Sequence, residues 1–112
     1  MPPELGGEGG GTNPEQLFAA GYASCYLNAL SLVAAKREVD TSEATVTADV
    51  GLRAEPGGVG LVAELHVRMP GVDREMAEKL VERAYRVCPY SRATKDNIEV
   101  ALTIEEPAAA AA

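Results

Sequence analysis

The sequence predicts a two-layer α+β domain in which helices pack on one face of an antiparallel sheet. Helix-start signals at 13–16 precede a long uncharged segment at 17–35, and the segments 44–54 and 59–69 alternate between apolar and polar residues. A helical pattern at 73–88 precedes a last alternating segment at 98–104. The expected order is therefore α-β-β-α-β, and 112 residues are enough for one such domain.

The first helix is predicted to begin within the sequence TNPEQ. Asn13 can cap it, Pro14 suits the first helical position, and Gln16 can complete a capping box. No charged residue occurs at 17–35, so the helix is apolar on all sides, which is typical of the buried centre of a domain or of a membrane span. The amphipathic segments that follow can bury this helix, so we do not expect a membrane span.

The two strands after this helix are expected to form an antiparallel hairpin around a Pro-Gly turn at 55–58. One face of each strand is apolar. These faces consist of Val46, Ala48, Val50 and Leu52, and of Val59, Leu61, Ala63, Leu65, Val67 and Met69. His66 falls on the polar face, so we expect a solvated imidazole and assign it no role.

A second helix is expected after Asp73, which can cap it, and should end near Cys88 because Pro89 cannot continue it. Residues 98–104 then form the last strand, with no regular element expected between Pro89 and this strand. The predicted domain covers 13–105, preceded by a Gly/Pro-rich loop at 1–12 and followed by a disordered Ala-rich tail at 106–112.

Composition excludes several classes of function. The 17 Asp+Glu outnumber the 10 Lys+Arg, and the net charge of −7 argues against nucleic acid as a partner. Two cysteines are too few for a secreted disulfide framework, and no leader pattern opens the chain, so the cytoplasm is the expected compartment. One histidine and no CxxC spacing argue against a metal site, and no GxxxxGK[ST] motif indicates a phosphate loop.

The predicted elements supply too little surface to cover the first helix on all sides. Three short strands and one further helix leave part of its apolar surface exposed. A second chain, or sequence beyond these residues, is therefore expected to cover it.

Cys25 lies within the first helix and shares a face with Phe18, Gly21 and Tyr22. Such a wall, with Gly21 leaving room beside the sulfur, would suit a pocket for an apolar substrate. The same placement describes an inert core thiol. A reactive thiol needs a nearby cation, because burial alone raises the pKa of a cysteine.

Two long motifs decide between these alternatives. GTNPEQLFAAGYASC (residues 11–25) and VCPYSRATKDNIEV (residues 87–100) closely resemble the organic hydroperoxide resistance (Ohr) family of the OsmC superfamily, over roughly residues 4–105. The form CPYS indicates the Ohr branch. The resemblance implies a thiol-dependent peroxidase for organic hydroperoxides, including those of fatty acids, that works as an intertwined homodimer.

The resemblance also implies the roles of the two cysteines. Cys25 corresponds to the peroxidatic thiol, which becomes a sulfenic acid, and Cys88 to the resolving thiol, which closes an intramolecular disulfide. Dihydrolipoamide on a lipoylated protein is the implied reductant, acting as a co-substrate with no bound cofactor. Phe18, Gly21 and Tyr22 are the expected substrate contacts.

Glu15 matches the glutamate that pairs with an arginine near the thiol in this family. In the family that arginine comes from a strand segment preceding a PKELGG-like loop, whereas this chain begins at MPPELGG. Either Met1 is an internal methionine of a longer chain, or the short form is real and acts as a weak enzyme or as a binding module without turnover. In the short form, the candidate substitutes for the arginine are Arg53, Arg68, Arg86 and Arg92.

Overall fold

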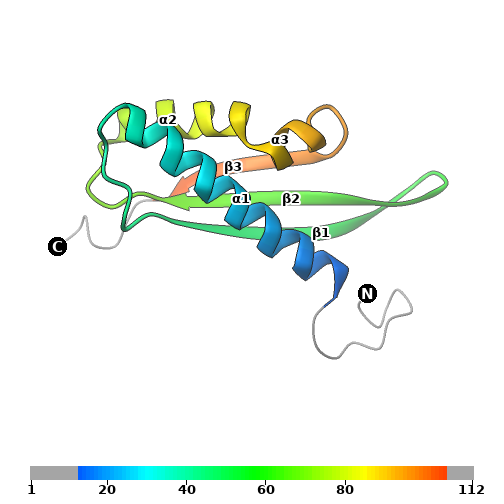
Figure 1. The fold of residues 1–112 in the computed structure, drawn as a ribbon. Coiled ribbons are helices and arrows are strands. Elements are labelled where there is room, and N and C mark those ends of the chain that lie inside the picture. Colours follow the sequence, from blue (N-terminus) through cyan, green and yellow to red (C-terminus); the bar gives the residue numbers. More distant parts are fainter. Residues whose placement is uncertain (1–12, 106–112) are drawn as a thin grey trace.

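The computed structural model describes residues 13–105, in which a helical layer packs on one face of a three-stranded sheet (Figure 1). In chain order the elements are α1 (Pro14–Lys36), β1 (Thr45–Glu55), β2 (Gly58–Arg68), α2 (Arg74–Val87), α3 (Pro89–Thr94) and β3 (Glu99–Glu105). The predicted α+β class is confirmed, with α3 as an additional element. The loop predicted at 1–12 and the tail predicted at 106–112 lie outside the described residues.

The capping box predicted for α1 is confirmed. The Asn13 side chain accepts a hydrogen bond from the backbone N–H of Gln16 at 2.8 Å, and the Gln16 side chain accepts one from the N–H of Asn13 at 3.3 Å. Two of the N–H groups that a helix start leaves without partners are thereby satisfied. The helix crosses the sheet diagonally (Figure 1).

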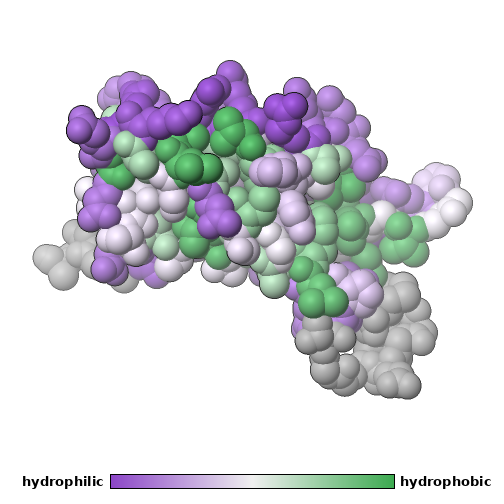
Figure 2. Space-filling model, in the orientation of Figure 1, coloured by the Kyte–Doolittle hydropathy of each residue, from purple (hydrophilic) through white to green (hydrophobic). Residues whose placement is uncertain are grey.

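Within residues 13–105, only one face of α1 is buried. The buried residues are Tyr22, Tyr26, Ala29, Leu30, Val33 and Ala34. On the other face, Leu17 and Leu32 are each 65% exposed. Figure 2 shows apolar and neutral residues along α1 on this side of the molecule, beside a hydrophilic border over α2. As the sequence predicts, the other described elements cover only one side of this apolar helix and leave part of its surface exposed.

By length and composition α1 could also cross a membrane, since an 18-residue stretch of this 23-residue helix has a mean hydropathy of 1.4. In this fold its buried face forms the core of the domain with apolar residues of the sheet and of α2. The core helix of a globular domain meets the same criteria of length and composition.

The sheet is mixed, which corrects the prediction of an antiparallel sheet. Strand β2 lies in the middle, antiparallel to β1 and parallel to β3. The chain leaves β2, passes through α2 and α3 over one face of the sheet, and returns to add β3 alongside β2. Such a crossover produces a parallel pair, whereas a tight turn produces an antiparallel one.

The predicted alternation of the strands is confirmed by the register. Val46 pairs with Val67 and Ala48 with Leu65, so apolar residues of β1 and β2 share the face under the helices. Leu102 of β3 lies opposite Leu65 on the other side. Since side chains of a strand point to alternate faces, His66 lies on the face away from the helices.

Helix α2 begins as predicted, with the Asp73 side chain accepting a hydrogen bond from the N–H of Met76 at 2.9 Å. It ends at Val87, and Cys88 takes an extended conformation that caps both α2 and α3. Helix α3 corrects the prediction of an irregular segment after Pro89. A helix of six residues is too short to show periodicity, and its signal is Pro89 at the first helical position.

Candidate functional site

The two cysteines, 63 positions apart in the chain, lie next to each other in the structure. The Cys88 Sγ donates a hydrogen bond to the Cys25 Sγ across 3.5 Å, and both residues are free thiols. A disulfide bond is about 2.05 Å long, so the two sulfurs are within a side-chain adjustment of bonding distance. Cys25 is partly exposed, whereas Cys88 is fully buried.

The break between α2 and α3 determines where Cys88 lies. Pro89 has no N–H and cannot continue α2, so the backbone turns at Cys88 (φ −67°, ψ 124°) before α3 begins. Both short helices around this turn pack on α1, which carries Cys25. The fold therefore places Cys25, in the middle of a long helix, beside Cys88, at the junction of two helices.

Burial raises the pKa of the Cys25 thiol above its ordinary value. A hydrogen bond from the Tyr90 backbone lowers this pKa, and the neighbouring Cys88 raises it. The net effect is a Cys25 thiol that is mostly protonated at neutral pH. No cation of residues 13–105 is among the groups that shift this pKa.

Three aromatic rings pack together close to the thiol pair. The ring centroids of Phe18, Tyr22 and Tyr90 lie 5.8 to 6.1 Å apart. Tyr22 is fully buried, and its hydroxyl is 2.8 Å from the Ser91 hydroxyl. Burial raises the pKa of Tyr22, so its hydroxyl stays neutral and serves as a hydrogen-bonding group.

The sequence pattern predicts Phe18 and Tyr22 for this region but not Tyr90. Tyr90 belongs to α3, far from both in the sequence, and no periodicity links it to α1. The only sequence signal was its place within the CPYS motif, two residues after Cys88.

Gly21 does not leave the open space that the sequence analysis expected beside the sulfur. A methyl group built on Gly21 would lie 3.0 Å from Oη of Tyr90. The missing side chain of Gly21 instead lets the Tyr90 ring pack against α1. Gly21 therefore shapes the aromatic cluster.

This close approach predicts the effect of Gly21→Ala. In an unobstructed helix the change would stabilise the protein by about 1 kcal/mol. Here the added methyl displaces Tyr90, and we expect urea denaturation to show a loss of about 1 kcal/mol, as is usual for overpacking. In a Tyr90→Ala background the same change should stabilise the protein. Equal effects in both backgrounds would show that the two residues do not compete for space.

Glu15 lies in the first turn of α1, and its Oε2 atom is buried without a hydrogen-bond partner among the described residues. Leaving a buried acceptor unpaired costs on the order of 1–3 kcal/mol. Two of the arginines considered as substitutes pair elsewhere: Arg53 with Glu55 and Glu99, and Arg86 with Glu82. Glu15 therefore offers a place for a donor that none of the described residues fills.

A second cluster of titratable groups lies on the outer face of the sheet. The His66 Nε2 is 3.0 Å from Asp49 Oδ2 and 3.3 Å from Glu64 Oε2. These three residues offer ligand atoms within 4.8 Å of one another. The strand pairing of β1 and β2 brings Asp49 to His66, which the linear sequence did not show. The hydrogen bond between His66 and Asp49 accounts for this arrangement, which lies on the face opposite the thiols.

Comparison with known proteins gives consistent matches. The family described as OsmC-like protein matches residues 7–103. An uncharacterized protein of Acinetobacter baylyi is 52% identical over 101 residues, covering 89% of this chain and 71% of that protein. An organic hydroperoxide resistance protein of Xanthomonas axonopodis pv. citri is 50% identical over 105 residues, covering 92% and 74%. The crystal structure of an organic hydroperoxide resistance protein from Elizabethkingia anophelis superposes with a TM-score of 0.88 at 50% identity, covering 96% and 78%.

Proposed function

The chain belongs to the OsmC-like protein family, and we propose that within it the protein acts as a thiol peroxidase that reduces organic hydroperoxides to alcohols. Its relatives named organic hydroperoxide resistance proteins support a role in hydroperoxide detoxification. The observation that carries the thiol mechanism is the 3.5 Å separation of two reduced sulfurs, one partly exposed and one buried.

Cys25 is the thiol that attacks the peroxide, because it is the one that solvent reaches. Its thiolate bonds to the distal oxygen while the O–O bond breaks, and the leaving alkoxide takes a proton to become the alcohol. Cys25 is then a sulfenic acid. The Cys88 sulfur attacks the Cys25 sulfur, the hydroxyl group leaves as water with the Cys88 proton, and a disulfide forms.

The aromatic cluster supports organic hydroperoxides as the substrate class. Phe18 and Tyr90 retain accessible surface beside the thiols, while Tyr22 supports them from the core. Contact with this surface removes an alkyl or aryl group of the substrate from water, which favours binding. Hydrogen peroxide has no such group.

Glu15 is a positioning residue in this proposal. Its buried, unpaired oxygen is suited to accept hydrogen bonds from a guanidinium, which would bring positive charge toward Cys25 and stabilise its thiolate. In the family that the sequence resembles, the partner of this glutamate is an arginine, which carries such a guanidinium.

A dithiol such as dihydrolipoamide on a lipoylated protein is the proposed reductant of the Cys25–Cys88 disulfide, and no bound cofactor is required. A homodimer is the proposed assembly. The uncovered face of α1, which includes Leu17 and Leu32, supports it, because a second copy would remove this apolar surface from water (Figure 2).

A binding module without turnover is the second candidate. The raised pKa of Cys25 and the unpaired oxygen of Glu15 favour it, since both describe a thiol that lacks a stabilising cation.

Steady-state kinetics separate the two candidates. The protein is supplied with dihydrolipoamide and with cumene hydroperoxide or hydrogen peroxide, and peroxide consumption is followed. The peroxidase proposal predicts catalytic turnover with a preference for cumene hydroperoxide. Consumption no faster than in the absence of protein would favour the binding module.

The raised pKa of Cys25 predicts how the first step depends on pH. Only the thiolate attacks, so the oxidation rate should rise about tenfold per pH unit below the pKa of the thiol. Because burial moves this pKa above its ordinary value, the rate should still be rising at about pH 8.5. Stopped-flow measurement of Cys25 oxidation from pH 6 to pH 9.5 tests this. A plateau below pH 7 would reveal a cation that the described residues do not supply.

A further inference from the structure

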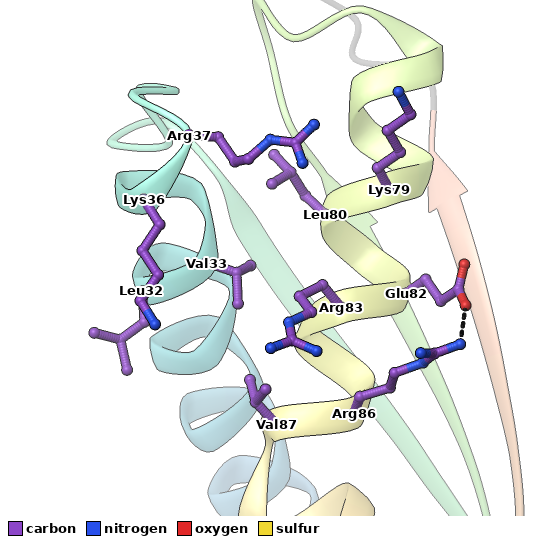
Figure 3. A pocket seen from close by; sticks show the side chains of 10 residues that line it. All are labelled: Leu32, Val33, Lys36, Arg37, Lys79, Leu80, Glu82, Arg83, Arg86 and Val87. Atoms are coloured by element: carbon purple, nitrogen blue, oxygen red, sulfur yellow. Dashed lines mark hydrogen bonds and ion pairs between the residues drawn. The ribbon is translucent and has the colours of Figure 1, made fainter.

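A groove lies between the C-terminal part of α1 and α2 (Figure 3). Its volume of about 500 Å³ is within the range of small-molecule sites. Its floor is apolar and consists of Val33, Leu80 and Val87, while Leu32, which also lines it, points away from α2 in Figure 3. Its basic lining residues are Lys36, Arg37, Lys79, Arg83 and Arg86. The groove thus combines an apolar surface with a band of cations.

The basic lining contrasts with the rest of the chain. The chain has a net charge of −7 and only 10 lysines and arginines. Five of these 10 residues line this groove. Glu82 is its single acidic lining residue, and the Arg86 Nη2 neutralises it at 2.6 Å. In Figure 3 these two side chains meet on the side of α2 away from α1. The remaining charge of the groove is therefore positive.

Arg83 has no carboxylate partner on its own helix. Lys79 and Arg86, its neighbours at helical spacing, pair instead with Glu75 and Glu82. The helix dipole accounts for cations at the end of α1, such as Arg37, but not for one in the interior of α2. Neither Arg83 nor Arg37 has an ion pair with a carboxylate among the described residues, and Figure 3 shows both guanidinium groups directed into the space between the helices.

We propose that this groove binds a long-chain carboxylate. The carboxylate lies between Arg37 and Arg83, and the alkyl chain packs on Val33, Leu80 and Val87. Charge complementarity selects an anion, because arginine binds carboxylates through charge-assisted hydrogen bonds. The apolar floor selects a chain over a small inorganic anion. A protein partner would need roughly 800 Å² of surface on each side, more than ten lining residues of one groove supply.

The site requires neither thiol, so its test is independent of the peroxidase proposal. Dodecanoate, below its micelle concentration, is titrated into the full chain and followed by calorimetry and by amide chemical shifts in NMR spectra. Dodecanol supplies the same chain without the charge, and acetate supplies the charge without the chain. Arg37→Gln and Arg83→Gln remove the proposed contacts. Arg53→Gln is the matched control, because Arg53 is an exposed arginine on β1 outside the groove.

Saturable dodecanoate binding with shifts at α2 and the end of α1 is expected. Each of Arg37→Gln and Arg83→Gln should weaken this binding about tenfold, whereas Arg53→Gln should change it less than about twofold. Dodecanol and acetate should each bind at least about tenfold more weakly than dodecanoate. Cys25→Ser should bind as the parent does.

Three results would overturn the proposal. They are equal binding of dodecanol and dodecanoate, unchanged binding in Arg83→Gln, and no dodecanoate binding. If binding is absent and amide exchange at α2 slows with rising protein concentration, a second copy is the occupant of the groove.

Discussion

Cys25→Ser should reduce the turnover of cumene hydroperoxide by about a thousandfold or more, as removal of a catalytic nucleophile usually does. The serine hydroxyl is not ionised at neutral pH and cannot take up the peroxide oxygen as a thiolate does. Cys25 is only partly buried, so the variant should remain folded. Peroxide consumption with dihydrolipoamide as reductant is the measurement.

Ser24→Ala is the matched control for this substitution. Ser24 is the exposed neighbour of Cys25 on α1, and its replacement should leave turnover within about twofold of the parent, as surface changes usually do. Full turnover in Cys25→Ser would assign the attack to Cys88 or to no cysteine at all.

Cys88→Ser should separate the two halves of the reaction. Cys25 should still be oxidised by one equivalent of hydroperoxide, at a rate within about threefold of the parent, because Cys88 does not touch the peroxide in the first step. The sulfenic acid then has no neighbouring thiol at 3.5 Å to condense with and should accumulate. Intact mass should show one added oxygen, and dimedone should trap it.

Because Cys88 is fully buried, Cys88→Ala is a second variant that avoids placing a hydroxyl in an apolar site. Both variants should trap the same species. Failure of both folded variants to oxidise Cys25 would contradict the assignment of Cys88 as the resolving thiol.

Local signals were sufficient to predict most of the helices and strands. Asn13 and Asp73 cap the helices that they were expected to cap, because a capping interaction is made within a few residues. The strands lie close to their predicted ranges, since alternation of apolar and polar residues directly reflects the two faces of a sheet.

The sequence did not show the features that arise from contacts between distant segments. The parallel pairing of β3 depends on the path of the crossover, which leaves no periodic signal in either strand. Tyr90 fills the space beside Gly21 because α3 packs on α1, and the six residues of α3 were too short to predict. The opposed cations Arg37 and Arg83 likewise come from two helices.

For the candidate site, the cysteines were selected through the family resemblance and not through composition or periodicity. Composition alone describes Cys25 and Cys88 equally well as core residues. Their proximity depends on the packing of the junction of α2 and α3 against α1, which is a tertiary property.

The most direct test of the thiol mechanism is the intact mass and free-thiol count of the reduced protein after one equivalent of cumene hydroperoxide. The mechanism predicts the loss of two hydrogens and of both thiols within a single chain, reversed by dihydrolipoamide. A folded protein that keeps both thiols while the hydroperoxide remains unconsumed would contradict it.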